Sequence, residues 1–276
     1  RAIPPNRLPA KNDVIFHPSR HPKEMPMSTT LNAPTRSGAA DAAAPGPIHA
    51  LPASRPGAVL AFLHFALFVV TLIVLSAAIG WPGVLREPAD VVFQRITGSM
   101  TATQAGYFSY LFSSLLMIPL ALLIRELFTR TGVAGWWIDP FAFLGAAAGV
   151  LKALGIVRWL LTMPLLARNH AQATSDAGRQ MVESVYLGVN AYGGSVGELL
   201  GVHLFSGLWI AGTAGVLLVR YGKRWVGLSG LLVAALTLVL ATRPFLPEVG
   251  ALESVSGPLW LAWLLGLSVM LWRGKA

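Results

Sequence analysis

Five ionisable side chains lie within the long apolar stretches of this sequence. They are His64, Lys152, Arg158, Glu198 and His203. Ionisable groups are costly to hold in hydrocarbon, so those within membrane helices face the protein interior, pair with one another or mark the path of a substrate or ion. An ammonium, a guanidinium, a carboxylate and two imidazoles can form a substrate or proton site or pair with one another. These residues are therefore the first candidates for function.

Lys152 stands on a face of small residues. Gly145 and Gly149 precede it by seven and three positions, so all three share one face of a helix, and their spacing forms a close-packing Gly-x-x-x-Gly motif. The pattern predicts that Lys152 points into a helix bundle and not at lipid. Two roles remain open for it: a substrate or proton site, or a structural ammonium held by carbonyls and a carboxylate.

Arg158 and Glu198 fall near the same ends of two neighbouring predicted helices. Their matched depth predicts a charge-assisted pair between them, because either charge alone in a low-dielectric setting is costly. The pair has either a structural purpose or forms a binding site that opens at that end of the bundle. With Lys152 and His203, these two residues make up the candidate intramembrane polar site.

The two membrane histidines raise the question of haem, which needs both ligands at one depth on facing helices. His64 and His203 lie at depths that differ by roughly 10 Å at a rise of 1.5 Å per residue, so we expect hydrogen-bonded packing residues instead. The sequence has no His-Glu-x-x-His motif, no Walker loop and no Gly-x-Gly-x-x-Gly. We predict no cofactor, no metal and no catalytic residue.

The composition defines the class of protein that must position these groups. The 276 residues are 54% hydrophobic and 12% charged, with a mean hydropathy of +0.61, whereas soluble domains are about 25% charged. This composition argues against a cytosolic enzyme and against a disordered chain, which would be polar. The net charge of +9 suits cytoplasmic loops and anionic lipid better than nucleic acid. The absence of cysteine removes disulfides, thiolate metal sites and cysteine nucleophiles.

Hydropathy predicts an all-α, polytopic bundle of about six membrane-spanning helices. The predicted spans are residues 57–80, 107–124, 141–166, 196–219, 226–241 and 258–272. Pro119 predicts a kink in the second span, and the third should bend or end near Pro164. Residues 179–190 form either an interfacial helix or an extension of the fourth span.

The first 56 residues differ from the rest. They hold most of the chain's 19 prolines and are basic, so we expect a disordered tail followed by one transmembrane domain over residues 57–276. Met27-Ser28-Thr29-Thr30 is typical of a natural start, and residues 1–26 are left out of the fold prediction.

Basic residues predict the orientation, because Lys and Arg favour cytoplasmic loops. One side carries Arg55, Arg125, Arg130, Arg220, Lys223, Arg224, Arg273 and Lys275. The other side carries Arg86, Arg95, Arg168, Arg179 and Arg243. Both termini are therefore predicted in the cytoplasm. Single cysteines test this: an impermeant reagent should not label one placed at Gly222 in intact cells, and labelling there would reverse the orientation.

Small residues and a basic turn mark the second half. Glu198 shares a helical face with Gly194, Gly201 and Asn190, beside a ladder of Gly193, Gly197 and Gly201. These faces should pack closely against another helix.

Three stretches in the second half of the chain form a further pattern. They are His203–Ile210, Gly215–Arg220 and Lys223-Arg224-Trp225-Val226-Gly227-Leu228-Ser229-Gly230-Leu231. Together with Val150–Trp159, they resemble the bacterial domain-of-unknown-function family 4386. The resemblance covers residues 57–272 and implies a bacterial inner-membrane protein of six or so helices, with no activity attached.

Three functions are compatible with these features. The leading one is a non-enzymatic accessory, structural or stress-related membrane component, which would have a dry bundle. The second is a small-molecule or ion transporter, which would have a continuous polar cavity. The third is a lipid-modifying membrane enzyme, which would open toward lipid beside a carboxylate and a histidine. The predicted partners are the lipid bilayer of the cell membrane and, through the glycine-rich faces, another membrane protein or a second copy.

Overall fold

A computed structural model describes residues 50–133 and 135–274. The predicted disordered tail lies outside these residues up to position 49. The chain is helical from Arg55, two residues before the predicted start of the first span. Ser54 caps this helix by accepting a hydrogen bond from the Gly57 amide at 3.4 Å, and Pro56 occupies its first turn, where no amide hydrogen is needed.

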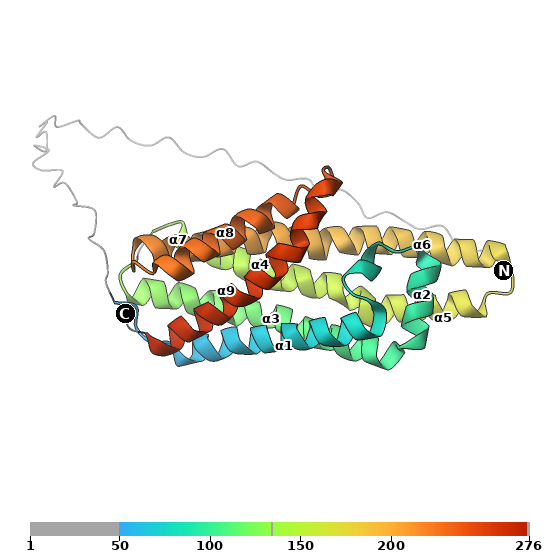
Figure 1. The fold of residues 1–276 in the computed structure, drawn as a ribbon, viewed down its shortest axis with the longest axis horizontal. Helices are drawn as coiled ribbons and strands as arrows, with labels where there is room; N and C mark the ends of the chain where they lie inside the picture. The colour runs from blue at the N-terminus through green and yellow to red at the C-terminus, as the bar shows by residue number, and fades with distance from the viewer. Residues whose placement is uncertain (1–49, 134, 275–276) are drawn as a thin grey trace, which may run out of the picture. The chain divides into compact units, whose positions relative to one another are not determined.

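The all-α membrane architecture is confirmed. The elements are α1 (Arg55–Ile79), the 3-10 turn η1 (Gly83–Arg86), α2 (Ala89–Gly98), α3 (Met100–Arg130), α4 (Ile138–Val157), the π-helical segment η2 (Arg158–Thr162), α5 (Met163–Gln172), α6 (Asp176–Gly194), the π-helical segment η3 (Ser195–Phe205), α7 (Ser206–Val219), α8 (Arg224–Leu240), the 3-10 turn η4 (Pro247–Leu252) and α9 (Glu253–Arg273). Five continuous helical segments are long and apolar enough to cross a membrane: α1, α3, α4–α5, α6–α7 and η4–α9. The shorter apolar helix α8 has 17 residues (Figure 1).

The sequence left two outcomes open near Pro164, a bend or an end of the helix. The third segment does not end there. It continues as helix to Gln172 after a π-helical segment, η2. Proline cannot donate a backbone hydrogen bond, so a carbonyl one turn earlier needs another donor. Gln104 on α3 supplies it, with its Nε2 donating to the Leu160 carbonyl at 3.4 Å. The irregular backbone is thus stabilised by a side chain of a neighbouring helix.

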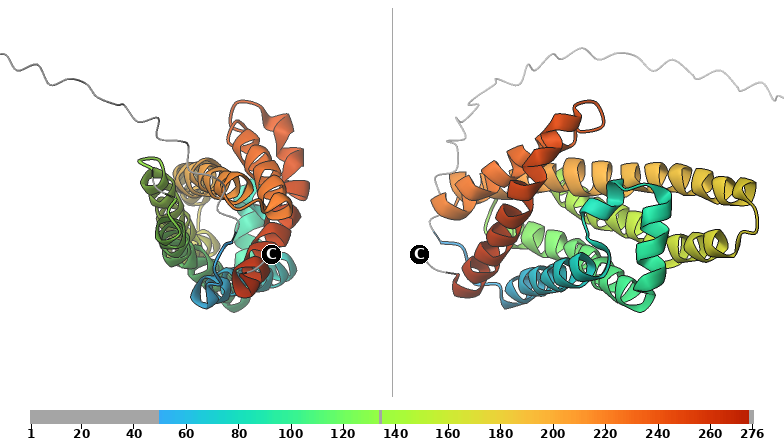
Figure 2. Two further views of the ribbon diagram at one scale, coloured as in Figure 1. Left: turned by 90° about the vertical axis from the view of Figure 1, so that its left-hand side faces the viewer. Right: turned by 45° about the vertical axis from the view of Figure 1, so that its right-hand side comes forward.

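The fourth segment runs without a break from Asp176 to Val219, so residues 179–190 extend the span and do not form a separate interfacial helix. Its 44 residues would reach about 66 Å at 1.5 Å per residue, well beyond a hydrocarbon core of roughly 30 Å. The segment is therefore longer than one membrane crossing needs. The amphipathic helix α2 lies against the hairpin of α5 and α6, as Figure 1 and the right-hand view of Figure 2 show.

A second apolar core stabilises this end of the bundle. Phe93 on α2 is 2% exposed, and its ring centroid lies 5.1 Å from that of His170 on α5 and 5.2 Å from that of Tyr186 on α6. His170 Nε2 also lies 2.9 Å from Glu183 Oε1 on α6. We call α2, α5 and α6 the helical cap.

Glycines let α4 and η3 cross at very short range, as the sequence predicted for these small-residue faces. A Cβ on Gly155 would lie 2.6 Å from the Cα of Gly197 and 3.0 Å from the carbonyl oxygen of Gly193. A Cβ on Gly201 would lie 2.8 Å from the Lys152 amide nitrogen. The crossing has no room for any side chain, and it places Lys152 beside the π-helical segment that carries Glu198.

Candidate functional site

The six apolar segments surround a cavity of about 850 Å³. All four residues of the predicted polar site line it, and so does His64. Aromatic and aliphatic side chains make up much of the rest, including Phe68, Trp81, Tyr107, Tyr110, Trp159, Ile210 and Trp260. Cavities of roughly 300–1,000 Å³ with apolar walls and a few polar groups are typical of small-molecule sites. We call this space the central cavity.

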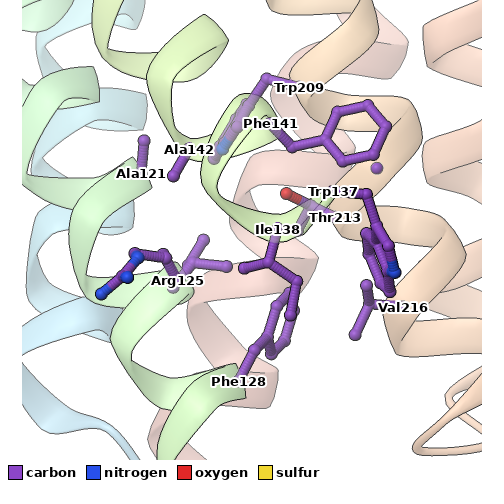
Figure 3. A pocket seen from close by; sticks show the side chains of 12 residues that line it. Ala121, Arg125, Phe128, Trp137, Ile138, Phe141, Ala142, Trp209, Thr213 and Val216 are labelled. Carbon is purple, nitrogen blue, oxygen red and sulfur yellow. The ribbon is translucent and has the colours of Figure 1, made fainter. Parts of the chain in front are cut away.

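A second pocket is too small for such a ligand. Figure 3 shows it between the rings of Phe141, Trp137 and Phe128, with Trp209 at one end. It holds only about 20 Å³, which is the space that one water needs. Arg125 at its edge is already paired, with its Nε 2.7 Å from Asp139 Oδ1. This pocket is a packing gap.

Lys152 projects into the central cavity, and no anionic partner for it lies among the residues that the structure describes. Its residue is 6% exposed, and its Nζ lies 3.2 Å from Met117 Sδ and 5.7 Å from the centroid of the Trp260 ring. Within residues 50–133 and 135–274, no carboxylate comes within 4.0 Å of this ammonium. A thioether is a weak acceptor and an aromatic face a modest attraction for a cation. The carboxylate expected for a purely structural lysine is therefore missing from the described part of the chain.

Glu198 belongs to a cluster of four charged side chains from separate parts of the chain. Arg86 of η1 contacts both acids, with its Nη2 3.2 Å from Glu198 Oε1 and 2.8 Å from Glu253 Oε1. Arg243, between α8 and η4, also contacts both, with its Nη1 2.5 Å from Glu253 Oε1 and 3.5 Å from Glu198 Oε1. We call these four residues the ionic cluster. Their charges balance, and three of the four, Arg86, Glu198 and Glu253, line the central cavity.

The predicted pairing of Arg158 with Glu198 is wrong. Arg158 donates to the Gly155 carbonyl at 2.9 Å and to Asn190 Oδ1 at 3.3 Å. Asn190 in turn donates to the Leu85 carbonyl at 3.4 Å, so Arg158 is fixed to α6 and to the turn after α1. Both charges do line the same cavity. Glu198 instead meets arginines from connecting segments whose folding the sequence pattern did not predict.

Neither histidine behaves as a simple hydrogen-bonded packing residue. His203 is 6% exposed, and among the described residues neither of its ring nitrogens has a hydrogen-bond partner. Its Nε2 lies 3.9 Å from Glu198 Oε1. His64 is 2% exposed, its ring lies 5.8 Å from that of Trp260, and its Nδ1 likewise has no hydrogen-bond partner within the described part of the chain. Both imidazoles face the central cavity.

Sequence reasoning missed several residues of the site. Arg86 and Arg243 enter the sequence analysis only through the count of basic residues, and Glu253, Tyr110 and Trp260 are not among its candidates, yet Arg86, Glu253, Tyr110 and Trp260 line the central cavity and Arg243 contacts Glu198. One signal was available: the loops holding Arg86, Arg243 and Glu253 lie on one side of the predicted bundle, the side on which Glu198 was also placed. A charged side chain near the end of a membrane helix can pair with an opposite charge in a loop at the same end of the bundle.

Comparison with known proteins gives a family and no activity. No curated protein matches this chain, and no solved structure does. The predicted resemblance is confirmed, because the model of the family described as "Domain of unknown function (DUF4386)" matches residues 57–273. The protein is thus a polytopic membrane protein, and the chain belongs to the DUF4386 family.

Proposed function

We propose that this protein is a membrane transporter of an amphipathic organic anion, which it binds in the central cavity. The observation that carries this proposal is the lone ammonium of Lys152 inside a cavity of about 850 Å³ with largely apolar walls. A dry bundle would have favoured an accessory or structural component. A cavity of this size, lined by all six apolar segments, favours a protein that binds a small molecule.

The chemistry of the walls defines the ligand class. Lys152 offers three donors when it is protonated, so an acidic group placed against its Nζ would supply the acceptor that Met117 provides only weakly. A hydrogen bond to a charged group contributes about 1.5–3 kcal/mol. The rings of Trp159, Tyr110 and Trp260 would cover the apolar part, at about 25 cal/mol for each Å² removed from water. Fatty acids and other apolar carboxylates meet both requirements.

The helix geometry supports transport over static binding. Residues of both π-helical segments, η2 and η3, line the central cavity. Irregular backbone at membrane depth is tolerated where it lines a cavity, and transporters place such interrupted helices at their substrate sites. π-Helical turns are rare and are frequently found at functional sites.

The ionic cluster connects three segments around the cavity. It joins η1, η3 and the region of η4 and α9 through side chains that are 21–37% exposed. Alternating access to a central site would require these segments to move relative to one another, and with them the contacts of this network.

Replacing Lys152 with Met should weaken anion binding without unfolding the protein. The probe is a brominated long-chain fatty acid, whose bromines quench tryptophan, and Trp260 lies 5.7 Å from Lys152. We expect Lys152→Met to raise the Kd of this acid by about 10–100-fold, which corresponds to losing one charge-assisted hydrogen bond. Met keeps the volume and removes an unpaired buried charge, so the melting temperature should not fall.

The matched control is Lys223→Met, in the turn before α8 and outside the cavity lining. It should bind the acid like the native protein. A brominated fatty alcohol of equal length should bind the native protein and Lys152→Met alike. Equal affinity of Lys152→Met and the native protein for the acid would refute the assignment of Lys152 as the anion-binding group.

A further inference from the structure

We infer that Glu198, His203 and Glu253 form a binding site for one divalent transition-metal ion. Each residue offers one ligand atom, and these three atoms all lie within 4.8 Å of one another. All three residues line the central cavity. The site is separate from Lys152 and does not depend on the transport proposal.

The condition of His203 points to a ligand. A buried imidazole normally has a hydrogen-bond partner, because an unsatisfied buried polar group is costly. His203 is 6% exposed, and within the described residues both of its nitrogens lack one. Its Nε2 is 3.9 Å from Glu198 Oε1, which is too long for a hydrogen bond. Two ligands of one tetrahedral Zn²⁺ lie about 3.4 Å apart for metal–ligand distances of 2.1 Å. The Glu198–His203 pair, at 3.9 Å, is close to this spacing, and the set of three atoms, within 4.8 Å of one another, would contract around the ion.

The π-helical winding of η3 is what brings two of the ligands together. Glu198 and His203 are five positions apart in the chain. In an α-helix of 3.6 residues per turn, such residues point about 140° apart. A π-helix bonds residue i to residue i+5 and therefore places them on one face. η3 spans 11 residues, Ser195–Phe205, and so includes both side chains. Glu253 then approaches from the first turn of α9.

The ionic cluster supports the site instead of filling it. The contacts of Glu198 with Arg86, Arg243 and His203 all use its Oε1. Glu253 accepts from Arg86 through both oxygens, at 2.8 and 3.1 Å. Because a carboxylate has about four lone-pair positions on its two oxygens, each of these acids keeps lone pairs for an ion. Arg86 and Arg243 would orient the two carboxylates, as outer-shell partners of metal ligands do. One imidazole and two carboxylates suit Zn²⁺, Fe²⁺ or Mn²⁺ and do not suit Cu⁺.

Zinc binding by the intact protein tests this site. The protein is purified through a tag without histidines, equilibrated with ZnCl₂ and desalted, and its zinc is measured by mass spectrometry. We expect one zinc per chain. His203→Ala and Glu253→Gln should each weaken binding by at least about 100-fold, since even outer-shell changes cost about 10–100-fold. The matched control is His170→Ala, which removes the other described histidine that lies beside a glutamate, in the helical cap.

Zinc should also raise the melting temperature of the native protein and of His170→Ala, but not that of His203→Ala. This measurement on the native protein needs no variant to fold. Failure of the native protein to retain or respond to zinc would overturn the metal site, as would equal binding by the native protein and a folded His203→Ala. Neither result would affect fatty-acid binding at Lys152, so the two proposals fail separately.

Discussion

Trp209→Ala should lower the free energy of unfolding by about 3–5 kcal/mol, the range found for buried aromatic residues cut to alanine. Trp209 is 1% exposed and packs where α4, α7 and α9 meet. Its ring lies 6.1 Å from that of Trp263 at 84°, and a Cβ on Gly145 would lie 2.5 Å from it. Loss of the indole leaves a cavity that three packed helices cannot close. Denaturant unfolding in detergent measures the effect.

Trp225→Ala is the matched control. Trp225 is 90% exposed, at the start of α8, so the same substitution should change stability by no more than about 0.5 kcal/mol. Similar losses in the two variants would show that Trp209 is not a central packing residue.

Trp209 also begins a series of aromatic contacts that reaches the cavity wall. It packs against Trp263, whose ring centroid lies 5.6 Å from that of Trp260 in that wall.

Gly155→Leu should destabilise the protein by about 3 kcal/mol, at the upper end of the cost of overpacking. A Cβ there would lie 2.6 Å from the Gly197 Cα and 3.0 Å from the Gly193 carbonyl oxygen. These are backbone atoms, which cannot rotate away as a flexible side chain can. The helices must separate, and Gly155 and Gly197 both line the central cavity. Fatty-acid binding should therefore weaken together with stability.

Gly188→Leu provides the comparison on the exposed face of α6, where a Cβ would meet no atom within 4 Å. Leucine has a better helix propensity than glycine by nearly 1 kcal/mol, so this variant should be slightly more stable than the native protein. The two substitutions are chemically identical and are expected to have opposite signs. A stable Gly155→Leu with unchanged binding would contradict the close crossing of α4 and η3.

Hydropathy predicted the spans well because the bilayer imposes a strong constraint on composition. All six predicted apolar segments are helical, and Lys152 points inward as the positions of Gly145 and Gly149 required. The helix ends were harder. The α5–α6 hairpin continues beyond the apolar stretch, since its stability comes from packing with Phe93 of α2 and not from burial in lipid.

The candidate site was predicted in part. Lys152, Arg158, Glu198 and His203 do line one cavity, but the partner predicted for Glu198 was wrong. Face assignments that assume 3.6 residues per turn fail within η2 and η3, where the winding is π-helical. The arginines that contact Glu198 come from connecting segments. Their positions depend on tertiary contacts that hydropathy and spacing do not encode.

The most direct test of ligand binding at Lys152 is mass spectrometry of the folded protein purified from its native membranes. The native protein and Lys223→Met should each retain a small apolar molecule with an acidic group, at about one per chain. Lys152→Met should lose it while it keeps its fold. Retention of the same acid by Lys152→Met, or the absence of any acidic molecule from the native protein, would contradict the proposal that the central cavity binds an amphipathic anion.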